Sequence, residues 1–253
     1  MAEPENGTPS TSVRDPGADA PTGPGDRPDL DFEILSAQPL QRAAAPTLSF
    51  GARVTDRSAI AVYTIALTVL FTIEPGKRSY AEADRERLVE LFGEPERWAS
   101  TTGSFRWAQV DVLVPSFTGS TEFAIKLPCT YDHEIAATKY FGGLEDGQAP
   151  LQLHFNGTVF YQGENGKLQL TLLPWDLSVR YELPVETWRG MIAGHYPEGD
   201  WIRLSPGTRE RLGRHKASTG SATFDGAVAG MLDGLDEHEG PEPDGEPGGA
   251  GNA

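Results

Sequence analysis

The chain of 253 residues contains a single cysteine, Cys129, so it cannot form an internal disulfide. A chain without disulfides suits a reducing compartment. Its N-terminus places Glu3 and Glu5 where a signal peptide would carry Lys or Arg, and no apolar run follows them. We therefore expect a cytoplasmic protein.

Long hydrophobic runs are also lacking. The longest, residues 59–73, is about 15 residues long and includes three threonines, whereas a membrane-spanning helix needs roughly 20 apolar residues. The β-branched content of this run predicts a buried strand instead. We expect no association with a membrane.

Basic residues are scarce: 21 Lys and Arg stand against 37 Asp and Glu, which gives a net charge of −16. An acidic chain repels phosphate, so nucleic-acid binding is not expected. Residues 1–30 carry −4 and residues 233–253 carry −7, which leaves −5 for residues 31–232. Both ends are rich in Pro and Gly and are predicted to be disordered, as solubilising linkers or as a docking tail for a basic partner. Residues 31–232 are long enough to form one domain.

Short stretches of alternating apolar and polar residues dominate the predicted domain. About nine of them, with Leu151–Asn156 and Thr158–Tyr161 counted separately, predict antiparallel strands. One helix pattern begins with Ser79 and Glu82 as a capping box, a second begins at residue 132, and others follow residue 184. We therefore predict a mainly β (α+β) fold, an antiparallel β-sandwich with peripheral helices and a C-terminal helical cap.

Local patterns also predict how neighbouring strands connect. Alternating stretches on both sides of residues 115–120 predict a hairpin. A change of apolar phase between Trp107 and Val110 predicts a bulge near Gln109. Asn165-Gly166 predicts a second, two-residue hairpin turn.

Three tryptophans lie outside both the predicted strands and the predicted helices. Trp98 follows the first predicted helix, and we interpret it as a lid over the edge of the core, with an exposed anchor for a partner as the alternative. Trp175 and Trp201 have apolar neighbours, so we expect them in the core. Exposed on one sheet face, they would instead suit a sugar-binding surface.

No catalytic motif is present: the chain has neither a G-x-S-x-G elbow nor a Gly-rich phosphate loop before a helix. Cys129, His133 and Glu134 lie within six residues, and His154 is a further candidate ligand. One Cys and one His do not form a zinc spacing, so we predict no metal site, no cofactor and a buried structural cysteine. The alternative is a nucleophilic Cys129 with His154 as its base.

Five strings carry a resemblance to a known family. They are RERLVELFGEPERW (85–98), VPSFTGSTEFAIKLPCTYDHEIAATKYF (114–141), GQAPLQLHFNGTVFY (147–161), LPWDLSVRYELPVETWR (173–189) and WIRLSPGTRERLGRHK (201–216). Together they resemble an uncharacterised bacterial domain of unknown function, found mainly in actinobacteria and often encoded near genes for a NiFe hydrogenase and its maturation factors. The resemblance covers roughly residues 32–232. It carries no assigned activity and implies an accessory protein of a metalloenzyme.

We therefore expect a non-enzymatic protein that binds a hydrogenase subunit or maturation factor, in assembly or in the organisation of electron transfer. The candidate binding residues lie at the two ends of one predicted strand: Phe117, Thr118, Gly119, Cys129, Tyr131 and Asp132. Two alternatives stay open. One is a hydrolase-like enzyme with a pocket near Cys129 and His154, and the other is a carbohydrate-binding module.

Overall fold

A computed structural model describes residues 10–13, 27–98, 102–130, 135–163, 166–197 and 204–236. The strands are β1 (Ser10–Val13), β2 (Leu30–Pro39), β3 (Thr47–Asp56), β4 (Val62–Ile73), β5 (Phe105–Val114), β6 (Ser120–Pro128), β7 (Gln148–Gln162), β8 (Leu168–Leu172) and β9 (Ser178–Pro184). The helices are α1 (Glu82–Phe92), α3 (Ala136–Gly143), α4 (Val185–His195), α5 (Pro206–Thr219) and α6 (Phe224–Asp236), with short 3-10 turns η1 (Pro75–Lys77) and η2 (Pro95–Arg97).

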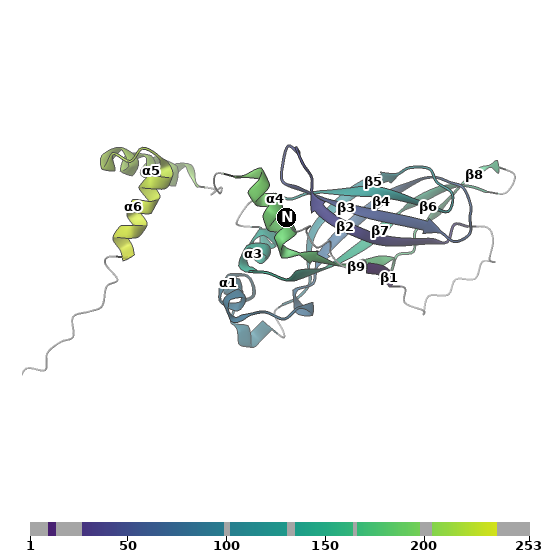
Figure 1. Cartoon of the computed structure of the whole chain (residues 1–253), viewed down its shortest axis with the longest axis horizontal. Coiled ribbons are helices and arrows are strands. Elements are labelled where there is room, and N and C mark those ends of the chain that lie inside the picture. The colour runs from purple at the N-terminus through teal and green to yellow at the C-terminus, as the bar shows by residue number, and fades with distance from the viewer. Residues whose placement is uncertain are drawn as a thin grey trace, which may run out of the picture. The chain divides into compact units, whose positions relative to one another are not determined.

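The chain divides into two compact units, residues 1–201 and 202–253. The first unit holds all the strands together with α1, α3 and α4, and the second holds α5 and α6 (Figure 1). Because α5 and α6 form a unit of their own, a role for them as a cap on the strands stays a prediction. None of the described helices is long and apolar enough to cross a membrane.

The strands of the first unit form two antiparallel sheets. One has three strands, β2, β3 and β6, and the other has five, β4, β5, β7, β8 and β9. The short β1 pairs with both β2 and β9. The fold is therefore mixed α+β, and its two sheets contain eight strands where about nine were predicted.

The count differs because β7 is one continuous strand of 15 residues. The sequence analysis counted the stretches on either side of Gly157, residues 151–156 and 158–161, as separate strands. Here Gly157 keeps the strand intact at a point of close approach: a Cβ added to it would lie 2.1 Å from the carbonyl oxygen of Ala66 in β4. Glycine is required by the packing of β7 on β4.

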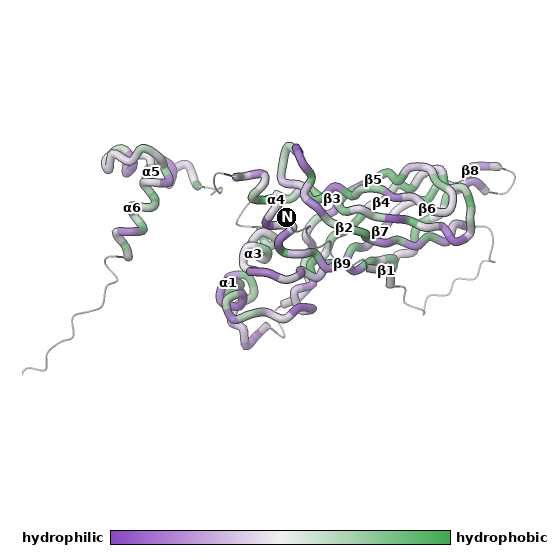
Figure 2. Tube along the Cα trace, in the orientation of Figure 1, coloured by the Kyte–Doolittle hydropathy of each residue, from purple (hydrophilic) through white to green (hydrophobic). Residues whose placement is uncertain are grey.

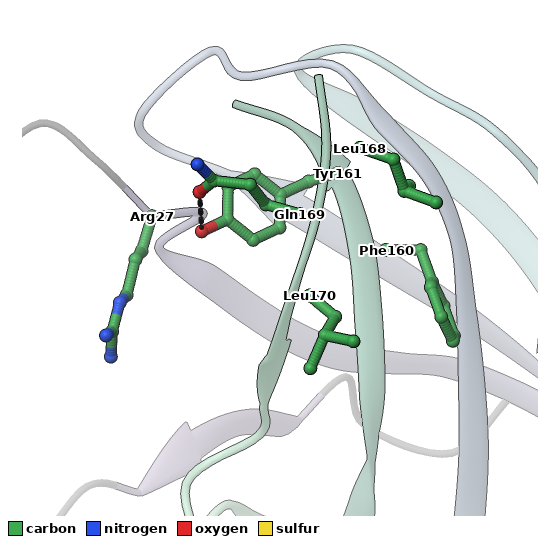
Figure 3. Close-up of a pocket in the computed structure, with 6 residues that line it drawn as sticks. All are labelled: Arg27, Phe160, Tyr161, Leu168, Gln169 and Leu170. Atoms are coloured by element: carbon green, nitrogen blue, oxygen red, sulfur yellow. Dashed lines mark hydrogen bonds between the residues drawn. The ribbon is translucent and has the colours of Figure 1, made fainter. Parts of the chain in front are cut away.

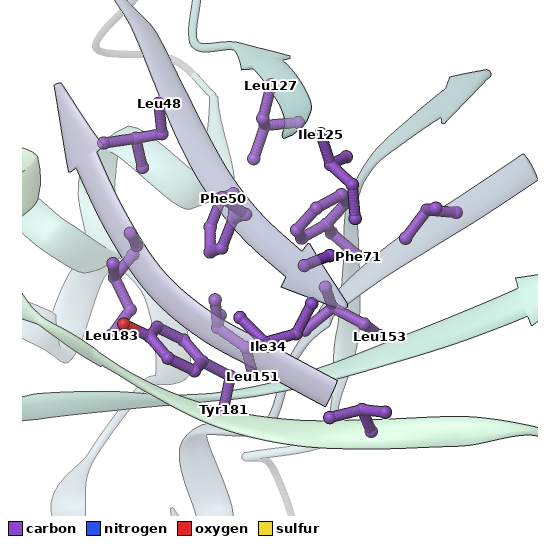
Figure 4. Packing of buried hydrophobic residues seen from close by; sticks show 14 of the residues in the cluster. Ile34, Leu48, Phe50, Phe71, Ile125, Leu127, Leu151, Leu153, Tyr181 and Leu183 are labelled. Carbon is purple, nitrogen blue, oxygen red and sulfur yellow. The ribbon is translucent and has the colours of Figure 1, made fainter. Parts of the chain in front are cut away.

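The core lies where the apolar faces of the two sheets meet. Phe32 of β2 stacks on Phe155 of β7, with ring centroids 4.8 Å apart. Phe50 of β3 reaches Phe71 of β4 at 5.0 Å and Tyr181 of β9 at 5.9 Å (Figure 4). Along the strands hydrophobic residues are mixed with hydrophilic ones, as one buried face requires (Figure 2). The two sheets share one core.

The helices of the first unit gather at one end of the strands, and β8 lies at the other end (Figure 1). This follows from the connections. The segments that leave β4, β6 and β9 contain α1, α3 and α4, whereas residues 57–61 and 115–119 are short connections. Since neighbouring strands run antiparallel, the helical segments fall at one end of the sheets and these two short connections fall at the other.

One prediction about connections needs correction. Residues 115–119 do not close a hairpin, because β5 pairs with β4 in the five-stranded sheet and β6 pairs with β3 in the three-stranded one. The predicted bulge near Gln109 is confirmed and lies at Trp107: Phe71 is opposite Ala108, and Thr72 is opposite Arg106. The predicted pairing of β7 with β8 is also confirmed. Gly166 has a φ of 72°, and Asn165 lies outside the described residues.

Candidate functional site

The first predicted binding segment, Phe117 to Gly119, serves mainly to join the two sheets. Phe117 is buried and exchanges two backbone hydrogen bonds of 2.9 Å with Val62. The carbonyl of Gly119 accepts a 2.6 Å hydrogen bond from the N–H of Asp56. Thr118 is the exposed side chain of the three. The segment offers little surface to a partner.

The second predicted segment starts at Cys129, directly after β6. Its side chain is buried, and its sulfur contacts the carbonyl oxygen of Leu127 at 3.5 Å. Burial raises the pKa of the Cys129 thiol to about 12, so the thiol stays protonated at neutral pH and is a poor nucleophile. Tyr131 and Asp132 lie outside the described residues.

The structure does not bring His154 to Cys129. His154 lies on β7 between Leu153 and Phe155, both of which are buried in the core between the sheets. Because successive side chains of a strand point to opposite faces, His154 belongs to the outer face of the five-stranded sheet. Within the described ranges, no group of three or more His, Cys, Asp or Glu side chains is placed to hold a metal ion. His133 and Glu134 lie outside those ranges.

The most buried charged contacts tie helices to strands. Asp84 of α1 accepts a 2.9 Å hydrogen bond from the N–H of Glu145 and pairs with Arg78 at 3.4 Å. Arg78 also donates to the carbonyl oxygens of Asp146 and Gln148. Together these bonds fix α1 against the connection between α3 and β7. We interpret this network as architectural.

The tryptophans separate into two kinds. The indole of Trp98 is 8% exposed, and its Nε1 donates to the carbonyl of Gly93 at 2.8 Å, which confirms the predicted lid. Trp175 is 83% exposed, so the expectation that it lies in the core is wrong. It stands in the loop between β8 and β9, whose apolar residues Leu173 and Leu177 turn inward instead. Trp201 lies outside the described residues.

Sequence reasoning missed a surface centred on β8. Its side chains Leu168, Leu170 and Leu172 alternate onto one face of the strand and are 65%, 65% and 71% exposed. The sequence predicted residues 168–172 as a strand of the hairpin at Asn165-Gly166. A sequence pattern does not show whether the leucine face of such a strand meets a second layer, and for β8 the leucines are exposed.

Strand register extends this surface across the sheet. Leu172 is opposite Thr158 of β7, Thr158 is opposite Ala66 of β4, and Ala66 is opposite Leu113 of β5. Directly opposed residues share a face, and Leu113 is 75% exposed. We call the following set the outer apolar surface: Leu168, Leu170, Leu172, Phe160, Ala66 and Leu113.

A polar row borders the outer apolar surface on the side toward the helices. Asn156 of β7 is opposite Thr68 of β4, which is opposite Asp111 of β5. The hydroxyl of Thr68 donates a 2.6 Å hydrogen bond to the carboxylate of Asp111. An apolar centre with a polar rim is typical of a protein-binding surface.

An open depression of about 470 Å³ lies beside β8 and is lined by Arg27, Phe160, Tyr161, Leu168, Gln169 and Leu170 (Figure 3). Tyr161 donates a 2.9 Å hydrogen bond from its hydroxyl to Oε1 of Gln169. Phe160, Leu168 and Leu170 belong to the outer apolar surface. The depression is suited to receiving an apolar group.

Residues 27–240 match the profile of a family of unknown function, DUF6084. The chain belongs to this family. No curated protein matches this chain. Among solved structures, the chain is similar to a crystal structure of a Bordetella pertussis protein described as ApaA, with 13% identity, a TM-score of 0.26, and coverage of 64% of this chain and 98% of that one. So distant a likeness carries no functional argument.

Proposed function

We propose that this chain is a non-enzymatic, cytoplasmic protein that binds another protein through its outer apolar surface. The observation that carries the proposal is the exposure of Leu113, Leu170 and Leu172 on one face of the five-stranded sheet. Large apolar side chains gathered on one face are unfavourable in water unless a partner covers them.

The proposed partner is a subunit of a NiFe hydrogenase or one of its maturation factors. This choice rests on the resemblance of the strings quoted above to a family encoded near such genes, which is a contextual argument. The geometry adds a constraint on the partner. It should present a mainly apolar patch with polar groups at its edge, to match the row of Asn156, Thr68 and Asp111.

The positions of Cys129 and His154 give the hydrolase alternative little support. The thiol faces the core with its pKa raised, and the imidazole lies on the outer face. Nucleophilic catalysis needs the two groups within hydrogen-bond reach. The carbohydrate-binding alternative needs coplanar exposed rings on a sheet face, whereas Trp175 stands in a loop.

Affinity purification of the tagged chain from the organism that encodes it, followed by mass spectrometry, tests the proposal. We expect a hydrogenase subunit or maturation factor to copurify with the wild type and to be lost with Leu113→Asp. Gln109→Asp is the matched control, because Gln109 lies on the same strand beyond the polar row and the change adds the same charge. Copurification that is absent from the wild type, or unaffected by Leu113→Asp, contradicts the proposal.

A further inference from the structure

The feature that carries a further inference is the open edge of β8. Within the described residues β8 pairs with β7 alone. The N–H of Leu173 donates to the carbonyl of Gly157 at 3.0 Å, and the N–H of Gly163 donates to the carbonyl of Lys167 at 2.8 Å. In an antiparallel pair, hydrogen-bonded positions alternate with non-bonded ones. The leucines therefore direct their backbone N–H and C=O groups away from β7.

The loop between β8 and β9 divides the strands that pair with this side of β7 into two, β8 before the loop and β9 after it. Leu172 is opposite Thr158 and Ser178 is opposite His154, so residues 173–177 span only residues 155–157 of β7. The two extra residues bulge outward and carry Trp175. Beyond the loop, β1 covers the edge of β9 through Val179. The edge of β8 is left open.

We propose that two copies of this chain associate by antiparallel pairing of β8 with β8, about a twofold axis at Leu170. In that register Leu168 is opposite Leu172 of the second copy, and Leu170 is opposite Leu170. Each of the three opposed pairs exchanges two backbone hydrogen bonds, about six in all. The two five-stranded sheets then become one continuous sheet across the dimer.

The composition of β8 favours this self-pairing. The strand LQLTL contains no charged residue, so antiparallel pairing with itself places no like charges opposite each other. It also lacks the lysine, proline or inward charge with which edge strands usually resist pairing. The leucine pattern is symmetric about Leu170, so the leucines of both copies fall on the same face and double the outer apolar surface.

The chain's own ends are poor occupants of this edge. Residues 14–26 and residues 237–253 each contain three prolines, and Ala is the only aliphatic side chain in either segment. Proline has no N–H to donate to a strand, and alanine cannot cover a row of leucines. A strand of a different protein is the remaining competitor, and the experiment below separates it from self-pairing.

Sedimentation velocity of the purified full chain, from about 1 µM to about 1 mM, tests the proposal because weak specific association falls in this range. We expect a monomer–dimer equilibrium that strengthens with added salt, since each copy carries a net charge of −16. If the wild type stays monomeric over the whole concentration range, the proposal is overturned. The edge of β8 would then be available to a strand of another protein. The purified chain is used alone, so the outcome is independent of the proposed partner.

Leu170→Pro is the sharpest variant. The N–H of Leu170 points to the open edge, so proline removes a bond across the dimer and none to β7. We expect the dissociation constant of the dimer to rise at least 100-fold, while the circular dichroism spectrum stays that of the wild type. Leu113→Lys is the matched control, with similar exposure on the same face but on β5. A dimer that survives Leu170→Pro, or one that Leu113→Lys disrupts equally, overturns pairing through the edge.

A pair of double variants tests the register. Leu168→Lys with Leu172→Lys places like charges opposite each other in the proposed dimer and should abolish it. Leu168→Lys with Leu172→Asp places opposite charges there and should restore association. All these positions are largely exposed, so the substitutions leave the core untouched. Equal behaviour of the two double variants contradicts the register.

Discussion

Two tryptophans of the first unit, Trp98 and Trp175, lie in opposite environments. At the helical end, Trp98 is buried edge-on against Tyr80 and Phe92, and its indole N–H is bonded to Gly93. In the loop that follows β8, Trp175 is held out into solvent. A buried indole with a bonded N–H stabilises the fold, whereas an exposed one adds little to it. The helical end therefore contributes strongly to stability, whereas Trp175 contributes little, and the surface through which we propose binding begins beside it at Leu172.

The connections explain why the ends differ. The segments after β4, β6 and β9 are long enough to contain helices, and these segments supply aromatic residues that close the core: Tyr80, Phe92, Trp98, Tyr140, Phe141 and Trp188. The turns at the other end are too short to cover anything. The outer apolar surface, which includes the leucines of β8, lies beside these turns, away from the helices of the first unit (Figure 1).

The largest effect is expected from Gly157→Ala. This substitution tests whether the strands next to β8 contribute to the stability of the fold. The added Cβ would lie 2.1 Å from a backbone oxygen of β4, so two central strands must move apart. We expect a loss of about 4 kcal/mol or more in the free energy of unfolding, measured with urea. Such a loss would show that the close packing of β7 on β4 is needed for stability even though the side chains exposed on β8 are not.

Gly190→Ala is the matched control for Gly157→Ala. Gly190 lies in α4, and a Cβ there meets no atom within 4 Å. Alanine should stabilise this helix by about 0.5–1 kcal/mol. Equal effects of the two substitutions would show that the close approach of β7 and β4 is not a constraint.

A comparison of Phe141→Ala with Trp175→Ala addresses the two ends directly. Phe141 is fully buried and stacks on Trp188 with ring centroids 5.2 Å apart. Its truncation should cost about 3–5 kcal/mol. Trp175→Ala should change the free energy of unfolding by no more than about 0.5 kcal/mol, since the ring is exposed. A large loss for Trp175→Ala would remove the distinction between the ends.

A smaller effect is expected from Asp84→Asn, which weakens the attachment of α1 at the helical end. One side-chain oxygen can still accept from Glu145, but the amide nitrogen then faces the guanidinium of Arg78. We expect a loss of about 2 kcal/mol in urea unfolding. Glu145→Gln is the control, because its pair with Arg87 is largely exposed and should contribute less than about 0.5 kcal/mol. Similar losses for both would mean that Asp84 is not a special anchor.

Local patterns predicted most strands, because the alternation of apolar and polar residues depends on neighbouring positions. Some helix ends are local as well: Ser205 caps α5 by accepting from the N–H of Thr208, and Gly93 ends α1. Ser79 does not cap α1, which begins at Glu82 with Ala81 as its N-cap. Its first turn is held by Asp84 through a contact 61 residues away in the sequence. No local pattern contains a contact of that kind.

The pairing of strands within the two sheets could not be predicted from the sequence either, because it also depends on contacts between distant residues. The alternation around residues 115–119 is the same whether the next strand returns to its neighbour or crosses to the other sheet. Here Phe117 bonds to Val62, and β6 joins β3. The exposure of the β8 leucines likewise depends on the absence of a second layer over them within the described structure. The candidate surface could therefore be found only from the fold.

The smallest predicted effect concerns Glu182 of β9, opposite Pro150. Burial raises the pKa of its carboxyl, and the negative charge of Glu74 raises it further, against the attraction of Arg78, Lys77 and Arg180. A raised carboxyl pKa means that the folded chain holds this proton more tightly than the unfolded chain does. The contribution of Glu182 to stability therefore falls as the pH rises from 4.5 through the higher pKa of the folded state, and it stays low above that.

Glu182→Gln keeps this side chain neutral, so the variant should match the wild type in urea unfolding near pH 4 and be slightly more stable at pH 7. Glu94→Gln removes one exposed charge elsewhere and reports the effect of net charge alone. A Glu182→Gln variant that is less stable than the wild type at pH 7 would mean that attraction to the three cations outweighs burial. Charge as well as apolar packing would then hold the strands together near η1, and the contrast with the uncharged edge of β8 would be sharper still.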